Sequence, residues 1–252
     1  MLASERHTII LAELARHPAV SIRALTEKTG VSRETIRKDI ELLAQQQKLS
    51  QVRGGATKIQ TQEPSIESRS LTNPEGKARI ANYVASQIPD GASVIIDNGS
   101  TTLATAKRLA DTHQNLIVYT NDLRIAEVIS PATRELVFLG GRIVVSEMAT
   151  LGLEVMESLA RYRAEFALVS AGGLSEKVLF TDFSREAATL RHQMLSQAQK
   201  PFLLADNSKF GAIGQVVLNP VPKGTNIIVD KMPPKNVVAE LRKKQLLLHV
   251  AS

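Results

Sequence analysis

The sequence predicts an α/β protein with two domains, in which a winged helix-turn-helix precedes a larger, mostly parallel α/β domain. Three observations lead to this prediction. The chain has 252 residues, more than one average domain of roughly 100–200 residues. Apolar residues at helical spacing dominate the first part, whereas short apolar strands alternate with helices in the second. A polar stretch with two prolines separates the two patterns. We therefore expect domains at residues 1–58 and 75–252, joined by a linker at 59–74.

The composition excludes several kinds of site. Cysteine is absent, which excludes disulfides and thiolate zinc sites. The five histidines are scattered and never lie at ligand spacing, so we expect no metal and no cofactor. The charged first residues argue against a signal peptide, and no apolar run approaches the roughly 18 residues of a membrane span. We expect a cytoplasmic protein. Its net charge of +6 suits a polyanionic partner, although the same charge can serve solubility alone.

The first domain begins with two short helices. In the first helix, apolar residues recur at helical spacing as far as Pro18, because proline cannot extend a helix interior. Ser21 is a suitable N-cap for the second helix, residues 22–29, which buries Leu25. Gly30 then supplies the left-handed conformation that ends a helix. Residues 20–40, which comprise this second helix, the turn at Gly30 and the helix after it, therefore have the layout of a helix-turn-helix.

A third helix with two different faces is predicted from Ser32, its N-cap, to about Gln45. Ile36, Ile40 and Leu43 form one apolar stripe, and charged residues cover the other side. Residues near the start of a groove-inserted helix meet the edges of DNA bases. This predicts DNA contacts at Ser32, Arg33, Glu34, Thr35, Arg37 and Lys38. The competing interpretation is a solvated surface helix with an ion pair between Glu34 and Lys38.

The sequence pattern of residues 48–58 predicts a short hairpin directly after the third helix. Apolar Leu49 and Val52 alternate with polar residues around a glycine pair, which provides the freedom for a turn. A hairpin in this position makes the winged variant of the motif. Arg53 and Gly54 at its turn are further candidates for DNA contact, and Arg53 can reach phosphate.

The second domain alternates between helices and strands, which argues for a mostly parallel sheet covered by helices. Helices are predicted at residues 77–88, 103–110, 123–129, 155–162, 186–198 and 237–243. Strands are predicted at residues 93–96, 116–119, 136–139, 166–169, 202–204, 226–229 and 246–250.

Polar and glycine residues cluster directly after these strands, at the edge where open α/β sheets bind ligands. The sharpest cluster, residues 97–102, follows a strand and opens a helix, where backbone N–H groups and small hydroxyls suit a phosphate. Other groups expected around the same edge are Asn121, Gly140–Arg142, Gly172–Gly173 and Lys209. Each has a simpler interpretation: a tight turn at residues 140–141, a helix cap at Asp97, a solvated lysine at residue 209.

Seven motifs along the chain resemble the DeoR family of bacterial transcriptional regulators. They are VSRETIRKDI at 31–40, RGGA at 53–56, DNGSTT at 97–102, TN at 120–121, LGGR at 139–142, SAGG at 170–173 and DNSKF at 206–210. The resemblance extends over essentially the full length. It implies a winged helix-turn-helix followed by a sensor domain similar to ribose-5-phosphate isomerase. It also implies repression of sugar or related catabolic genes, relieved by a phosphorylated sugar or a sugar-derived metabolite.

The resemblance also assigns effector-binding residues at the matching positions. They are Asp97, Gly99, Ser100, Thr101, Thr120, Asn121, Gly140, Gly141, Gly172, Gly173, Asp206 and Lys209. Thr102 and Arg142, which follow strands at the same edge, complete the predicted effector-binding residues. Two departures from the family pattern concern the DNA contacts. The wing usually reads Gly, Arg and His where this chain has Gln47, Gln51 and Arg53, which removes a basic residue at position 51. Lys38 replaces the second arginine of the recognition motif, which favours phosphate over bidentate base contact.

The leading hypothesis is a ligand-responsive repressor that is not an enzyme. Its expected partners are double-stranded operator DNA, a phosphorylated sugar or sugar-derived molecule, and further copies of itself in a homodimer or homotetramer. The alternative is a sugar-phosphate isomerase-like enzyme with a DNA-binding appendage. It needs a general base, for which Asp97, Asp182 and Glu186 are the available carboxylates near the edge. A structural DNA-binding protein is a third hypothesis, and it leaves the edge motifs without a purpose.

Overall fold

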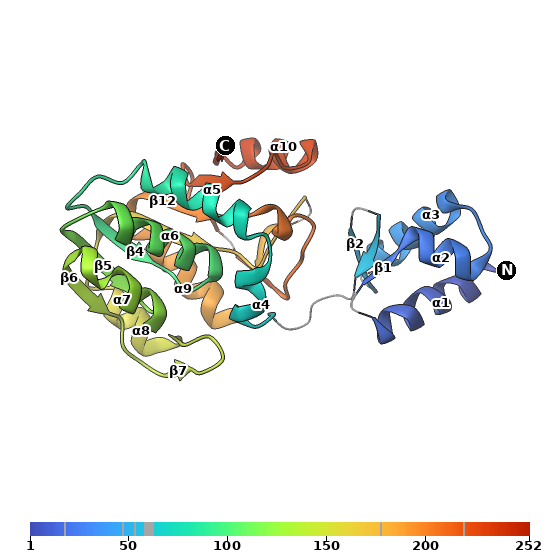
Figure 1. The fold of residues 1–252 in the computed structure, drawn as a ribbon, viewed down its shortest axis with the longest axis horizontal. Helices are drawn as coiled ribbons and strands as arrows, with labels where there is room; N and C mark the ends of the chain where they lie inside the picture. The colour runs from blue at the N-terminus through green and yellow to red at the C-terminus, as the bar shows by residue number, and fades with distance from the viewer. Residues whose placement is uncertain (18, 47, 53, 58–62, 177, 219) are drawn as a thin grey trace. The chain divides into compact units, whose positions relative to one another are not determined.

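The structure is a computed structural model that describes residues 1–252 apart from 18, 47, 53, 58–62, 177 and 219 (Figure 1). The predicted helix stop at Pro18 and the predicted DNA contact at Arg53 lie outside the described residues. The chain forms two compact units, one of Met1–Thr61 with Gly211–Ile213 and one of Gln62–Phe210 with Gly214–Ser252. No helix in the described part of the chain combines the length and apolar character needed to cross a membrane.

The N-terminal unit has the predicted helix-turn-helix and wing. Its helices are α1 (Ala3–Arg16), α2 (Ile22–Thr29) and α3 (Arg33–Gln45). Its strands β1 (Ala19–Ser21), β2 (Ser50–Val52) and β3 (Gly55–Thr57) form an antiparallel sheet in the order β1-β3-β2. The hairpin β2–β3 is the predicted wing. The pairing of β1 with β3 was not predicted, because three residues before a helix carry too little pattern to indicate a strand.

Local capping explains where α2 and α3 begin and end. The Ser21 hydroxyl accepts a hydrogen bond from the Ala24 amide at 3.1 Å, and the Ser32 hydroxyl accepts one from the Thr35 amide at 3.1 Å. Gly30 follows α2 with φ 69°, the left-handed conformation in which a side chain is disfavoured. These are the predicted caps, and they set the tight turn between the two helices.

A buried carboxylate joins α1 to α3. The Arg6 guanidinium donates from Nε and Nη2 to the two oxygens of Asp39, at 2.6 and 3.0 Å. The His7 Nε2 atom lies 3.2 Å from Asp39 Oδ1. Around this contact, aliphatic side chains from all three helices and the wing form the core: Ile10, Leu14, Leu25, Ile36, Ile40, Leu43 and Leu49. The Asp39 contacts therefore orient α3 from the side opposite its exposed face.

A seven-stranded sheet organises the C-terminal unit, and every neighbouring pair in it is parallel (Figure 1). The strands, in spatial order, are β15 (Leu247–Val250), β14 (Asn226–Val229), β12 (Ala198–Leu204), β9 (Ala164–Ser170), β4 (Ser93–Ile96), β5 (Leu116–Thr120) and β6 (Thr133–Phe138). The predicted alternation of strands and helices is confirmed. Since all strands run the same way, their carboxyl ends meet at one edge.

Helices cover both faces of this sheet. Residues of α5 (Pro74–Ala85), α6 (Ser100–Thr112) and α7 (Leu123–Ile129) share one apolar core with the strands. Residues of α8 (Leu153–Leu159), α9 (Arg185–Ser196) and α10 (Lys235–Lys243) share a second. Two buried cores around one sheet define a three-layered α/β architecture.

The structure contains a helix in the segment predicted as a linker. Helix α4 spans Ile66–Leu71, with Ile66 and Arg69 buried, and Ser65 caps it by accepting from the Ser68 amide at 3.3 Å. The stretch predicted as a linker therefore contains a helix that was not predicted. A polar six-residue helix is held by tertiary burial of two side chains, which a local pattern does not reveal. A small antiparallel sheet of β10 (Gly173–Ser175), β11 (Leu179–Asp182) and β13 (Val216–Val217), and the short pair β7 (Ile143–Val144) and β8 (Ala149–Thr150), were also not predicted.

Replacing Asp39 tests the contact between α1 and α3. Burial raises the pKa of Asp39, but the hydrogen bond and charge of Arg6, aided by His7, bring it below its ordinary value. We expect Asp39→Asn to reduce the stability of the N-terminal unit by about 1.5–3 kcal/mol at pH 7, because bonds to a charged acceptor are lost. The measurement is hydrogen-exchange protection of peptides from α3.

The same contact predicts the pH dependence. A carboxylate with a depressed folded pKa stabilises above its unfolded pKa, about 4, and that contribution is lost as the pH falls through the folded pKa. The difference between wild type and Asp39→Asn should therefore shrink below pH 4. Glu41→Gln, an exposed change on the same helix, is the control. A difference of equal size at pH 3 and pH 7 would contradict the ionised contact.

Candidate functional site

The exposed face of α3 carries the predicted DNA contacts. Arg33, Glu34, Arg37 and Lys38 are all exposed. Glu34 accepts from Arg37 Nη1 at 2.7 Å, and these side chains are 60% and 57% exposed. The pair that forms is thus not the Glu34–Lys38 pair of the competing interpretation. An exposed pair of this kind contributes only about 0–1 kcal/mol, so Arg37 can exchange Glu34 for another acceptor at small cost.

Three other predicted DNA contacts lie at the start of α3 or at the turn of the wing. The Ser32 and Thr35 hydroxyls are 2.9 Å apart at the start of α3, where Ser32 also caps the helix. Gly54 lies exposed at the turn of the wing with φ 89°, and its carbonyl accepts from the Ile22 amide at 2.8 Å. Gly54 therefore ties the wing to the first turn of α2.

In the C-terminal unit, the residues after β4 and β5 form a hydrogen-bonded edge. The Asn121 side chain accepts from the Asn98 amide at 3.1 Å and donates to the Thr150 carbonyl at 2.9 Å. The Thr120 hydroxyl donates to the Ile96 carbonyl at 2.8 Å. Thr120 and Asn121 are fully buried, so these side chains hold the loop in place.

The start of α6 lies in the predicted phosphate loop. Gly99 is the N-cap, with φ 157°, and no side chain caps the helix. A Cβ atom at Gly99 would lie 2.6 Å from the Ser170 hydroxyl, so the loop approaches the end of β9 closely. Ser100, Thr101 and Thr102 are buried in the first turn. The uncapped N–H groups and the helix dipole suit an anion here.

Arg191 of α9 is fully buried between two carboxylates. Its Nε donates to Asp97 Oδ2 at 2.7 Å, its Nη1 contacts Asp182, and its Nη2 donates to the Asn98 carbonyl at 3.3 Å. Burial raises the pKa of Asp97 to about 6, with Asp182 adding to the rise and Arg191 opposing it. Sequence reasoning missed Arg191, because one arginine in a helix gives no sign of burial. Together the three side chains anchor the start of the phosphate loop.

Asp206 and Lys209 of the DNSKF motif have different surroundings. Asp206 is buried, faces Lys77 at 3.1 Å and accepts from the Asn73 amide group at 3.1 Å. Burial raises its pKa, but Lys77, Ser208 and Asn73 lower it below the ordinary value. The half-buried Lys209 donates its backbone amide to the Asp206 carbonyl at 2.9 Å, but its side chain has no hydrogen bond or ion pair among the described residues. Burial lowers its pKa despite the carboxylates of Asp206 and Glu63. The Asp206 side chain is thus paired within the fold, whereas the Lys209 side chain is left available to a ligand.

The remaining predicted residues lie at the ends of β6 and β9. Gly140, Gly141 and Arg142 are exposed, and Arg142 pairs with Glu186 of α9 at 2.8 Å, where both side chains are about half exposed. Gly172 and Gly173 are buried, and Gly173 begins β10. The structure therefore leaves Arg142 on a more open surface than the buried groups after β4 and β5.

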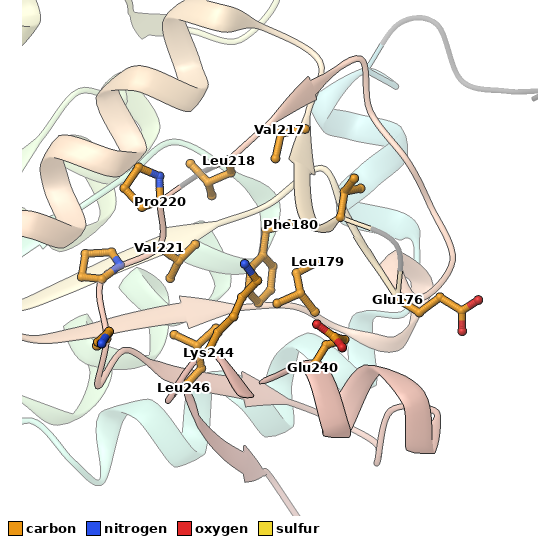
Figure 2. Close-up of a pocket in the computed structure, with 13 residues that line it drawn as sticks. Glu176, Leu179, Phe180, Val217, Leu218, Pro220, Val221, Glu240, Lys244 and Leu246 are labelled. Atoms are coloured by element: carbon orange, nitrogen blue, oxygen red, sulfur yellow. The ribbon is translucent and has the colours of Figure 1, made fainter. Parts of the chain in front are cut away.

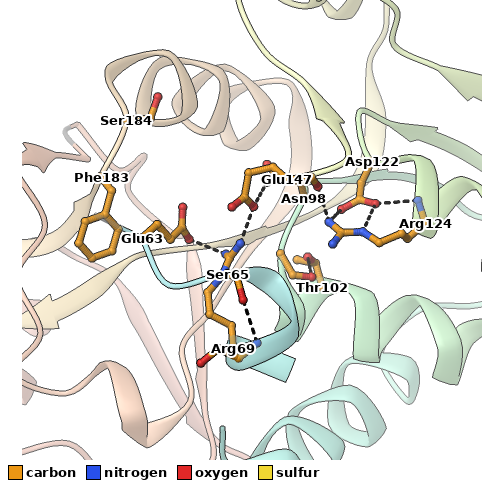
Figure 3. Close-up of polar contacts among 12 residues, drawn as sticks. Glu63, Ser65, Arg69, Asn98, Thr102, Asp122, Arg124, Glu147, Phe183 and Ser184 are labelled. Atoms are coloured by element: carbon orange, nitrogen blue, oxygen red, sulfur yellow. Dashed lines mark hydrogen bonds and ion pairs between the residues drawn. The ribbon is translucent and has the colours of Figure 1, made fainter. Parts of the chain in front are cut away.

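Four residues that meet at the same edge were largely missed, and we call them the Arg69 cluster. Arg69 donates from Nη1 to Glu63 and from Nη2 to Glu147 (Figure 3). Asn98, in the phosphate loop, donates to Glu147 Oε2 at 3.3 Å. Of the four, only Asn98 lay in a recognised motif. Glu63 and Arg69 fell in the predicted linker, and Glu147 lies in the β7–β8 turn.

A cavity of about 500 Å³ lies elsewhere in this unit (Figure 2). Its walls are mainly apolar side chains of β11, the β13 region and the end of α10, among them Leu179, Phe180, Leu218 and Leu246. None of the predicted effector residues lines it. The charged side chains that line it are Glu176, Lys223, Glu240 and Lys244.

Comparison with known proteins gives matches to both units. A family model described as the DeoR-like helix-turn-helix domain matches residues 6–62, and one described as the DeoR C terminal sensor domain matches residues 72–231. Among solved structures, ribose 5-phosphate isomerase A from Methanocaldococcus jannaschii is similar with a TM-score of 0.40 at 16% identity, over 55% of each chain.

Curated relatives are similar over nearly the whole chain. The HTH-type transcriptional repressor GlcR of Bacillus subtilis (strain 168) is 31% identical over 92% of this chain and 90% of its own length. The glycerol-3-phosphate regulon repressor of Escherichia coli (strain K12) is 27% identical over 99% of this chain and 100% of its own. The sensor model alone covers more than half of the chain. The protein therefore belongs to the DeoR family of DNA-binding transcriptional regulators.

Proposed function

We propose that this regulator represses a sugar or related catabolic operon and leaves its operator when a phosphorylated sugar or sugar-derived metabolite binds the C-terminal unit. The observation that carries the proposal is the charge at the sheet edge. Arg69 and the phosphate loop meet at one carboxylate, and Lys209 lies within electrostatic reach of Arg69. Cationic groups beside an uncapped helix start favour a phosphoryl group. The name of the glycerol-3-phosphate regulon repressor points to the same ligand chemistry among the relatives.

On the DNA side, we propose that Arg33 and Arg37 read base edges and that Lys38 binds phosphate. The arginine fork matches the two acceptors of guanine in the major groove, whereas an ammonium group acts as a point charge. We also propose a homodimer or a homotetramer. Two recognition helices would then read half-sites about 34–36 Å apart, or at a multiple of that spacing.

The substitution Arg37→Ala tests whether DNA binding can be separated from effector binding. We expect it to weaken binding to fragments from the upstream region of the gene by about 1–3 kcal/mol, roughly 5- to 150-fold, because a base contact is lost. Thermal stabilisation by the effector should persist. Fluorescence anisotropy and thermal-shift assays measure the two effects. Arg108→Ala, an exposed change of equal charge on α6, is the control. Equal loss in both variants would assign the effect to net charge.

Lys209→Gln tests the effector side. We expect it to retain DNA binding but to lose thermal stabilisation by hexose and pentose phosphates. A ligand at about 100 times its Kd stabilises by about 2.7 kcal/mol, so the loss is measurable. Lys107→Gln, exposed on α6, is the matched control. Undiminished stabilisation of the Lys209 variant by the same sugar phosphate would exclude this lysine from the effector site.

A sugar-phosphate isomerase is the second candidate, and one observation favours it. Asp97 has a pKa of about 6, near that of an efficient general base, and its Oδ1 has no hydrogen-bond partner among the described residues. Against this, Asp97 is fully buried and its other oxygen binds Arg191. Glu186, another candidate base, is exposed and paired with Arg142. We propose a structural role for Asp97 and a non-catalytic sensor.

Asp97→Asn distinguishes these roles. Because the folded state binds this proton more tightly than the unfolded chain does, wild-type stability relative to the variant should fall as the pH rises from about 4 to 6, by at most about 3 kcal/mol. Urea denaturation across this pH range measures it. We also expect no turnover of pentose or hexose phosphates by the wild type. Turnover that disappears in Asp97→Asn would establish the enzyme instead.

A further inference from the structure

The Arg69 cluster places two carboxylates of the chain itself on one guanidinium at the candidate effector site (Figure 3). Glu63 precedes α4, and Glu147 comes from the β7–β8 turn. Each carboxylate receives a single contact from a different terminal nitrogen of Arg69. Arg69 therefore does not make the bidentate contact with one acceptor for which a guanidinium is best suited.

The two carboxylates are anchored to different degrees. Glu147 also accepts from Asn98, and Arg124 donates to its backbone carbonyl at 2.5 Å while bonding Asp122 at 2.6 Å. Among the described residues, Glu63 has only Arg69 as a hydrogen-bond or ion-pair partner. Glu63 is therefore the carboxylate that is easier to displace.

The surroundings also disfavour the charge on Glu63. Its side chain is 17% exposed. Burial raises its pKa, and Asp182 and Glu147 add to the rise, while Arg191 and Arg69 oppose it. Arg69 is 6% exposed, and its Nε atom is buried without a hydrogen-bond partner among the described residues. Arg69 is thus a buried guanidinium with a spare donor, and one of its two carboxylate partners is weakly anchored, so it can take a better acceptor in place of that partner.

We propose that Glu63 is an internal competitor for the anion site, and that the phosphoryl group of the effector displaces it from Arg69. This inference rests on the proposed function, since it names the group that the effector replaces. A phosphoryl group offers several oxygens and a higher charge than one carboxylate oxygen, so it can bond Arg69 bidentately. Lys209, electrostatically coupled to both Glu63 and Arg69, would share the same anion.

Displacement of Glu63 gives a route from the effector to the DNA-binding unit. Glu63 lies immediately after the first residue of the C-terminal unit in the chain, and α4 follows it. Releasing Glu63 frees the start of that unit from the sheet edge, so an occupied site changes the segment that leads to the helix-turn-helix. A ligand can drive such a change only through its different affinity for the two states, and competition for Arg69 supplies that difference.

Glu63→Gln tests the competition directly in the full-length protein. The variant removes the charge but keeps the size of the side chain. We expect it to bind inorganic phosphate about tenfold more tightly than the wild type. In the wild type, the state in which Arg69 is free of Glu63 is the minor one, whereas in the variant it is no longer minor. Arg69→Met should lose this binding. Glu67→Gln, an exposed change of equal charge on α4, should match the wild type. Isothermal titration at constant ionic strength measures the Kd values.

A second readout follows the segment itself. In the wild type, saturating phosphate should increase hydrogen exchange in peptides covering residues 63–71, and in Glu63→Gln this exchange should already be high without phosphate. Equal or weaker phosphate binding by Glu63→Gln would overturn the inference and leave the proposed function intact. If neither the wild type nor Glu63→Gln binds phosphate or any hexose or pentose phosphate, the proposed function fails, and the inference fails with it.

Discussion

The buried contact of Arg191 with Asp97 and Asp182 is the interaction on which the proposed effector site depends. It joins helix α9 to β11, the strand that precedes it in the chain, and to the end of β4, which is distant in sequence. Removing any one partner would leave an uncompensated charge in the interior, which is strongly destabilising. Because Arg191 also donates to the Asn98 carbonyl, the loop that opens α6 is fixed before any ligand arrives. The phosphate loop is therefore a preorganised feature of the fold.

Other charged side chains at this edge form ion pairs within the chain, and these pairs differ in how firmly they are held. Lys77 faces Asp206 in the interior, and Arg124 holds Asp122 and the β7–β8 turn. Arg69 divides its donors between two acceptors. The net stabilisation from a buried ion pair is small, because desolvation offsets most of the attraction. The free energy of Arg69 paired with an internal carboxylate can thus be close to that of Arg69 paired with a ligand anion. Two states of nearly equal free energy can be interconverted by a ligand that binds one of them better.

In the DNA-binding unit too, some charged side chains are held in buried contacts, whereas others form only exposed pairs. Asp39 is buried and holds Arg6 and His7, so the inner side of α3 is anchored to α1. On the outer side, Arg37 makes only an exposed pair with Glu34. An exposed pair contributes little to stability, so the orientation of α3 does not depend on the side chains that are proposed to contact DNA. The proposed DNA contacts and the anchoring of α3 therefore depend on different side chains of one helix.

The sequence by itself determined the two-domain organisation, the three N-terminal helices with their caps, and the parallel sheet with its polar strand ends. These features are local, since a period of apolar residues or a capping serine acts within a few positions of itself. Only the tertiary structure decided which polar residues are paired within the fold and which are not. Asp206 and Lys209 are three positions apart, yet one is buried against Lys77 and the other has no such partner among the described residues. The Arg69 cluster was hidden for the same reason: its partners Glu63 and Glu147 lie far apart in the chain, and burial of a charge depends on long-range packing that no local pattern encodes.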